Sequence, residues 1–134
     1  MEIFCDGGAR GNPGPSAAAF VVFKNDKAVY QESRYLGVNT NNYAEYTSLL
    51  MALEWINKNA NSDVKIILDS ELVKKQMTGE YKIKNNTLRL LAVKAKHLEN
   101  KFRYSITYEN VLREKNKHAD NLVNQTLDLY SANS

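Results

Sequence analysis

Four acidic residues of this 134-residue chain stand where they could act together: Asp6, Glu45, Asp69 and Asp120. Asp6 and Asp69 each end a short apolar segment, whereas Glu45 and Asp120 lie in the first turns of predicted helices. If the two apolar segments are neighbouring strands, all four carboxylates reach one face, where they repel one another unless cations lie between them. Oxygen ligands without a histidine or thiolate partner favour Mg²⁺ or Mn²⁺ over zinc, and two such ions are the usual apparatus for phosphodiester hydrolysis.

Each acid also has a purely structural interpretation. Asp69 could cap the helix that opens at Ser70, Glu45 and Asp120 could stabilise helix N-termini, and Asp6 could order the loop that follows it. A chain in which the acids did only this would be a non-enzymatic α/β interaction module, without metal-dependent stabilisation. The placement of all four at element ends on one predicted face favours the metal site.

The charge of the chain is unevenly distributed, although the net charge is only +3. Between Leu72 and Lys117, twelve Lys or Arg residues stand against four Glu residues, so the remainder of the chain is net acidic. An acidic half beside a basic half suits a protein that holds cations next to a polyanion. A lysine-rich solvated helix surface explains the same pattern, and charge alone does not decide between them.

The composition is that of an ordinary globular protein, with 43% hydrophobic and 25% charged residues, and the length predicts one domain over residues 1–134. No stretch approaches the roughly 20 apolar residues of a membrane helix, and no signal-peptide pattern is present. Cys5 is the single cysteine, which excludes a disulfide within the chain and fits a reducing compartment. We therefore expect a cytoplasmic monomer without a membrane partner.

The hydrophobic pattern predicts nine elements in the order βββαβααβα. Expected strands cover residues 1–6, 17–23, 28–36, 64–68 and 102–111, and expected helices cover 42–59, 70–79, 86–99 and 117–130. Residues 7–15 hold four of the six glycines and both prolines and are expected to form a loop. Hairpin-linked strands followed by helix-separated strands imply a mixed sheet, antiparallel at first and parallel later.

Four sequence blocks resemble the signature blocks of type 1 ribonuclease H. They are FCDGGARGNPGP at 4–15, TNNYAE at 40–45, LDS at 68–70 and NKHADNL at 116–122. The resemblance spans nearly the whole chain in the right order. It implies an α/β ribonuclease H-like fold, with a five-stranded mixed sheet of order 3-2-1-4-5 flanked by helices. It also implies an endoribonuclease that hydrolyses the RNA strand of RNA–DNA hybrids.

The same resemblance implies that Asp6, Glu45, Asp69 and Asp120 are catalytic and bind two Mg²⁺ or Mn²⁺ ions. In the family, one ion activates the attacking water and the other stabilises the departing 3′ oxygen. The products would carry 5′-phosphate and 3′-hydroxyl ends.

A second set of residues is implied to bind the substrate. Positions Gly11, Asn12 and Asn41 match groups that sense the 2′-hydroxyl of RNA. Thr40 and Asn42 match positions that grip a DNA-strand phosphate, and Ser70 lies where the family often contacts the nucleic acid. Thr40, Asn41 and Ser70 are also good capping residues, and this alternative stays open.

The chain departs from the family pattern at several points. Many bacterial members carry a histidine in the loop before the last acid, but here Asn110 stands ten residues before Asp120. His118 could take part in catalysis or pack at the helix terminus, and Glu114 or Lys115 could replace the missing histidine.

The basic protrusion of some bacterial members is also missing, so Lys74, Lys75, Lys82 and Lys84 are expected to help bind the substrate. Glu71 stands where many relatives carry glutamine, which leaves double-stranded RNA and RNA–DNA junctions open as further substrates. The nearest alternative function is a catalytically weak module that binds RNA–DNA hybrids or double-stranded RNA.

Overall fold

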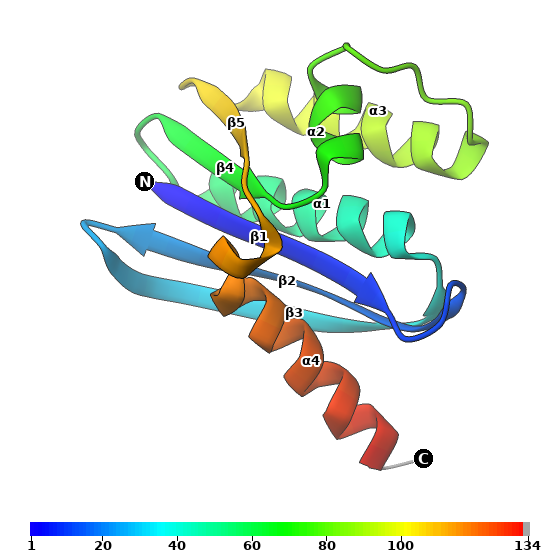
Figure 1. Ribbon diagram of the computed structural model, residues 1–134. Coiled ribbons are helices and arrows are strands. Elements are labelled where there is room, and N and C mark those ends of the chain that lie inside the picture. The colour runs from blue at the N-terminus through cyan, green and yellow to red at the C-terminus, as the bar shows by residue number, and fades with distance from the viewer. Residues whose placement is uncertain (133–134) are drawn as a thin grey trace.

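A computed structural model describes residues 1–132 and shows one sheet with helices on both of its faces (Figure 1). The strands are β1 (Glu2–Ala9), β2 (Gly14–Lys24), β3 (Lys27–Asn39), β4 (Val64–Leu68) and β5 (Ile106–Asn110). The helices are α1 (Asn41–Asn59), α2 (Glu71–Met77), α3 (Asn86–Lys101) and α4 (Lys117–Ala132), with a short 3₁₀ helix, η1 (Arg113–Lys115), before α4. Within this part of the chain, no helix is both long and apolar enough to span a membrane.

The five strands are arranged in the order β3-β2-β1-β4-β5, which confirms the predicted topology. β1 pairs antiparallel with β2 and parallel with β4, while β3 extends the antiparallel side and β5 the parallel side. β1 is thus the central strand, with a local hairpin partner on one edge and a partner from much later in the chain on the other.

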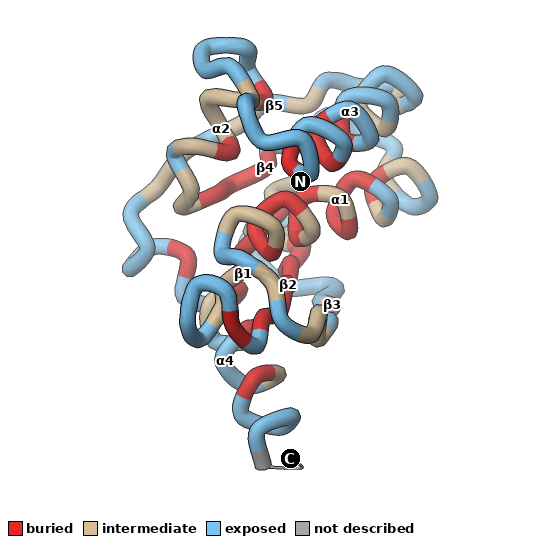
Figure 2. The backbone as a smooth tube through the Cα atoms, turned by 90° about the vertical axis from the view of Figure 1, so that its right-hand side faces the viewer, coloured by how far each residue is buried: buried red, intermediate tan, exposed pale blue. Residues whose placement is uncertain are grey.

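The two faces of the sheet are covered by different helices. Alternating β1 residues such as Ile3 and Cys5 join the main core beneath α1, α2 and α3, together with bulky side chains such as Phe20 and Leu53. The other face carries α4 and a small cluster around Ala19 and Val123. Figure 2 shows the same asymmetry, because buried segments run along α1 and the central strands whereas most of α4 is exposed.

The glycine-rich segment corrects the prediction of a loop over residues 7–15. β1 continues through Gly7 and Gly8 to Ala9, and both glycines pair with alanines of β2. Gly7 serves close packing rather than a turn, because a Cβ there would lie 2.2 Å from the Ala44 carbonyl of α1. Asp6 therefore lies within β1 and does not end it.

Other boundaries shift for local reasons. β3 continues past the expected end at residue 36 to Asn39, since β2 begins early enough to pair with it there. The last strand begins at Ile106 and not at residue 102, because α3 runs on to Lys101 and ends with Phe102 as its C-cap. These shifts leave the order of elements unchanged.

Candidate active site

The parallel pairing of β1 with β4 sets the first two carboxylates side by side. Cys5 pairs with Leu68, the last residue of β4, so Asp6 and Asp69 are the next residues of two neighbouring strands. Beyond this point β1 pairs with β2 alone, which leaves the other edge of its last residues open. The candidate site lies in this opening, where the sheet loses its fourth strand.

Helix α1 closes the opening and brings in the third carboxylate. Thr40 caps the helix, its Oγ1 accepting a hydrogen bond from the Tyr43 N–H at 3.2 Å. The missing side chain of Gly7 lets the backbone at Ala44 approach β1, and Glu45 is the next residue. Glu45 consequently projects beside the strand and is only 7% exposed.

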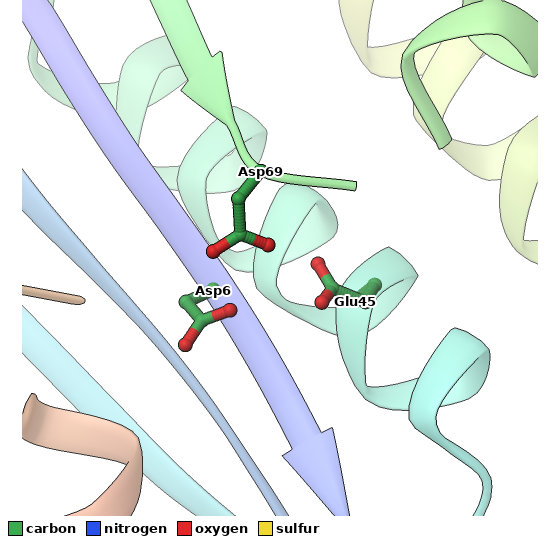
Figure 3. Close-up of side chains that lie close together, drawn as sticks. All are labelled: Asp6, Glu45 and Asp69. Atoms are coloured by element: carbon green, nitrogen blue, oxygen red, sulfur yellow. The ribbon is translucent and has the colours of Figure 1, made fainter. Parts of the chain in front are cut away.

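Three carboxylates from three elements converge at this point (Figure 3). One carboxylate oxygen from each of Asp6, Glu45 and Asp69 lies within 4.8 Å of the other two. Asp6 Oδ1 and Glu45 Oε2 are buried without a hydrogen-bond partner, as is Oδ1 of neighbouring Asn116, and they are the only such side-chain atoms in residues 1–132. Buried oxygens that lack donors and face one another fit a divalent cation.

Burial and mutual repulsion alter the acidity of this cluster. Burial first, then the charges of Asp69 and Asp120, raise the pKa of Asp6 to about 8. Burial, followed by the charges of Asp6 and Asp69, also raises the pKa of Glu45 well above its usual value. The Arg113 guanidinium of η1 opposes both shifts and lowers the pKa of each group, a role for which the sequence offered no local signal.

Asp120 lies beside the three carboxylates and outside the tight cluster. It stands in the first turn of α4, and its charge and proximity raise the pKa of Asp6. It does not belong to the set whose oxygens all lie within 4.8 Å of one another. The structure thus brings three of the four predicted acids together, with the fourth next to Asp6.

Asn116 is a site residue to which the sequence analysis assigned no role. It is fully buried between η1 and α4, and its amide donates to the Cys5 carbonyl at 2.8 Å and to Asp69 Oδ2 at 3.2 Å. An asparagine before a helix ordinarily suggests a surface cap, so only its place four residues before an acid pointed to this position.

The residues predicted to bind substrate gather at the open edge of β1. The Ala9 N–H donates to Asn41 Oδ1 at 2.7 Å, and the Asn41 N–H donates to Asn12 Oδ1 at 3.0 Å. These bonds fix the Gly11–Asn12 turn against the start of α1. Within the described chain, the side-chain nitrogens of Asn12 and Asn41 have no protein partner, so they remain available as donors.

Thr40 and Asn42 belong to a neighbouring pocket of about 460 Å³, which Asn12, Asn85 and Thr87 also line. Asn85 and Thr87 were not predicted as site residues. They stand at the start of α3, where the Asn85 side chain caps the helix. The pocket therefore offers several uncharged donors together with a helix N-terminus.

Two other predicted residues are engaged locally. Ser70 caps α2, with its Oγ accepting from the Val73 N–H at 3.2 Å. The His118 ring packs edge-on against Phe23, at a centroid distance of 5.1 Å. Of its two possible roles, this contact supports packing at the helix terminus. Glu71 pairs with Lys75 at 2.6 Å, which partly neutralises its charge beside the site.

Comparison with known proteins gives consistent matches. The family described as reverse transcriptase-like matches residues 4–126. The Bifunctional protein Rv2228c of Mycobacterium tuberculosis is 41% identical over 130 residues, which cover 96% of this chain and 35% of that protein. Ribonuclease HI of Halobacterium salinarum is 39% identical over 130 residues, or 96% of this chain and 64% of that protein. The chain thus spans about a third of the mycobacterial protein and under two thirds of the archaeal one.

Two solved structures resemble the fold along its whole length. The N-terminal RNase H domain of Rv2228c superposes with a TM-score of 0.91 at 37% identity, covering 98% of this chain and 96% of that one. LC11-RNase H1, solved in complex with an RNA/DNA hybrid, superposes with a TM-score of 0.90 at 38% identity, covering 99% of each chain.

Proposed function

Because this chain belongs to the reverse transcriptase-like family and carries a ribonuclease H-like domain, we propose that it is a metal-dependent endoribonuclease that cuts the RNA strand of RNA–DNA hybrids. The observation that carries the proposal is the convergence of Asp6, Glu45 and Asp69, whose buried oxygens include two without a partner. The likeness to LC11-RNase H1, which was solved with an RNA/DNA hybrid, supports the choice of substrate.

Asp6, Glu45, Asp69 and the adjacent Asp120 would hold the cations, for which Mg²⁺ and Mn²⁺ suit an all-oxygen donor set. Such ions would supply an acidified water and neutralise the charge that develops on the phosphate and the departing 3′ oxygen. The raised pKa of Asp6 and Glu45 supports this assignment, since bound cations would offset the burial and the mutual repulsion that raise it. Products with 5′-phosphate and 3′-hydroxyl ends are part of the proposal.

The chain's own polar groups would align the hybrid across the opening. Two hydrogen bonds hold the turn that carries Asn12 against Asn41 at the start of α1, and the side-chain nitrogens of both residues can donate to 2′-hydroxyls in the minor groove. The pocket of Thr40, Asn42 and Thr87 can hold a phosphate of the DNA strand by hydrogen bonds and by the α3 N-terminus. Substrate would therefore be recognised on both strands at fixed separation.

Cleavage of an end-labelled RNA–DNA hybrid, with Mg²⁺ or Mn²⁺, tests the proposal directly. Matched DNA duplex, RNA duplex and RNA–DNA junction substrates rank the specificity, and Asp69→Asn serves as the inactive control. We expect cuts in the RNA of the hybrid that require metal and disappear in the variant. A folded protein that cuts no hybrid with either metal would instead indicate a binding module.

Electrostatic attraction gives an independent check on substrate binding. Lys82 and Lys84 are exposed in the segment that joins α2 to α3. Replacing both by alanine should weaken hybrid binding on all sequences alike and reduce the slope of log affinity against log salt by about 1–2. Affinity that does not change between low and physiological salt would show that this segment does not face the nucleic acid.

A further inference from the structure

Asn116 joins the backbone of β1 to one of the site carboxylates. Its Nδ2 carries two protons, and the structure uses both: one bond reaches the Cys5 carbonyl at 2.8 Å and the other reaches Asp69 Oδ2 at 3.2 Å. Cys5 directly precedes Asp6 in β1. A single buried amide therefore fixes the Asp69 carboxylate against the strand that presents Asp6.

The orientation of this amide follows from its surroundings. Both partners of Nδ2 are acceptors without a proton, so the reverse orientation would place Oδ1 against a carbonyl and a carboxylate. Oδ1 is consequently left buried without a partner, as are Asp6 Oδ1 and Glu45 Oε2. A residue that served packing alone would not need an amide with an unsatisfied oxygen in the interior.

The backbone of Asn116 adds a third connection. Its carbonyl accepts a hydrogen bond from the Asp120 N–H at 3.1 Å, in the first turn of α4. One residue thus contacts β1 next to Asp6, the Asp69 carboxylate and the backbone of Asp120. Three of the four acidic positions are related to one another through it.

We propose that Asn116 is a positioning residue of the carboxylate cluster, which holds Asp69 at the separation from Asp6 that a divalent cation requires. This inference rests on the proposed function only in taking the cluster as a metal site. It predicts that loss of the amide weakens metal binding and slows the chemical step, while binding of the hybrid, which depends on other residues, is preserved.

The test compares Asn116→Ala with Asn57→Ala in two measurements. Asn57 is a matched control, because its amide also donates two hydrogen bonds, to the Leu53 and Leu98 carbonyls at 3.0 Å each, and contacts no carboxylate. Mn²⁺ affinity is measured by calorimetry without substrate, and kcat and KM are measured on an RNA–DNA hybrid. For Asn116→Ala we expect Mn²⁺ affinity and kcat to fall ~10–100-fold with KM within twofold. Asn57→Ala should change none of the three.

A second variant separates positioning from packing and covers poor folding of the alanine variant. Asn116→Leu keeps a side chain of similar size and removes the donor without adding a charge, so a packing role predicts that kcat at saturating Mn²⁺ is nearly normal. The positioning role predicts a loss at least as large as that of alanine. Mn²⁺ affinity and kcat within twofold of the wild type in Asn116→Ala, or equal losses in Asn57→Ala, would overturn the inference. If the wild type binds Mn²⁺ but cuts no hybrid, the affinity comparison still decides it.

Discussion

The two faces of the sheet bury side chains of very different kinds. Under α1, α2 and α3, twenty buried residues of the described chain form one continuous core with several aromatic and long aliphatic side chains. Under α4, the corresponding cluster contains four, namely Ala17, Ala19, Val123 and Leu127. By strand alternation Asp6 lies on this second face, since its neighbour Cys5 belongs to the main core.

One face of the sheet therefore provides most of the stability, and the other borders the candidate active site. The main core removes most of the apolar surface from water and so contributes most of the free energy of folding. The α4 face instead borders an opening in which buried carboxylates repel one another. Stabilising contacts on the first face compensate for this unfavourable charge on the second. Substitutions in the apolar cores and substitutions in the carboxylate cluster should therefore have opposite effects on stability and cleavage.

The largest effect is expected from removing a charge in the cluster. Asp6→Asn should lower cleavage of the hybrid by about a thousandfold or more, because the electrostatic framework for the phosphate is lost. Its free energy of unfolding without metal should stay equal or rise, since a repelled buried charge is gone. Cleavage rates and urea unfolding measure the two quantities. A stability loss that matches the activity loss would contradict the separation of the two faces.

Next in size is the contrast between core substitutions on the two faces. Leu53→Ala in α1 should lower the free energy of unfolding by about 3 kcal/mol, because Leu53 is fully buried in the main core. Val123→Ala in α4 should cost only about 1 kcal/mol, since fewer buried atoms surround it. Denaturant unfolding measures both, and cleavage per folded molecule should remain near normal in both. Equal costs would show that the α4 face is packed as tightly as the other.

The acidity of Asp6 gives a pH-dependent effect on stability. Its folded pKa is raised to about 8 from an ordinary value near 4, so between these values the folded chain binds more protons than the unfolded chain. The metal-free free energy of unfolding must then fall as pH rises from about 4 to about 8. Thermal unfolding in a chelator follows this fall. The decrease in stability with pH should be shallower in Asp6→Asn, and added Mg²⁺ should offset it. A stability that does not change with pH would contradict the raised pKa.

The smallest effect concerns Arg113 of η1. Because its charge lowers the pKa of Asp6 and Glu45, Arg113→Ala should raise both further in the metal-free protein. The Arg113 side chain is exposed, so solvent screening keeps this increase in pKa small. Carboxyl carbon resonances followed through a pH titration would measure it. Lys115→Ala serves as the control, because the charge of Lys115 is not among those that shift the pKa of Asp6 or Glu45. A pKa change of similar size in this control would refute the role of Arg113.

Much of the fold could be predicted from local patterns. The strand 64–68 was predicted with its observed bounds, and its parallel pairing with the first strand explains why Asp69 lies beside Asp6. Helical periodicity placed Glu45 near the start of α1. Both follow from the alternation of apolar residues and the usual helix signals, which act over a few neighbouring residues.

The remainder depends on contacts between distant segments. Gly7 suggested a loop, whereas β2 pairs with it and α1 packs onto it, and neither contact is visible locally. Asn116 and Arg113 lie in a polar, lysine-rich stretch that resembles a solvated loop. The 3₁₀ turn η1 places Asn116 in the interior, and it places the charge of Arg113 near Asp6. A single sequence contains no short-range signal for either placement.

The central position of β1 has a consequence for the order of events during synthesis. β1 and its hairpin partner β2 emerge before Asp69, which follows Asp6 by some sixty residues, and α4 emerges after all of them. A nascent chain that has not yet delivered α4 lacks Asp120 and the helix that follows Asn116, so its carboxylate cluster is incomplete. The proposed nuclease would thus stay inactive toward nucleic acid, including the messenger RNA from which it is translated, until α4 has docked.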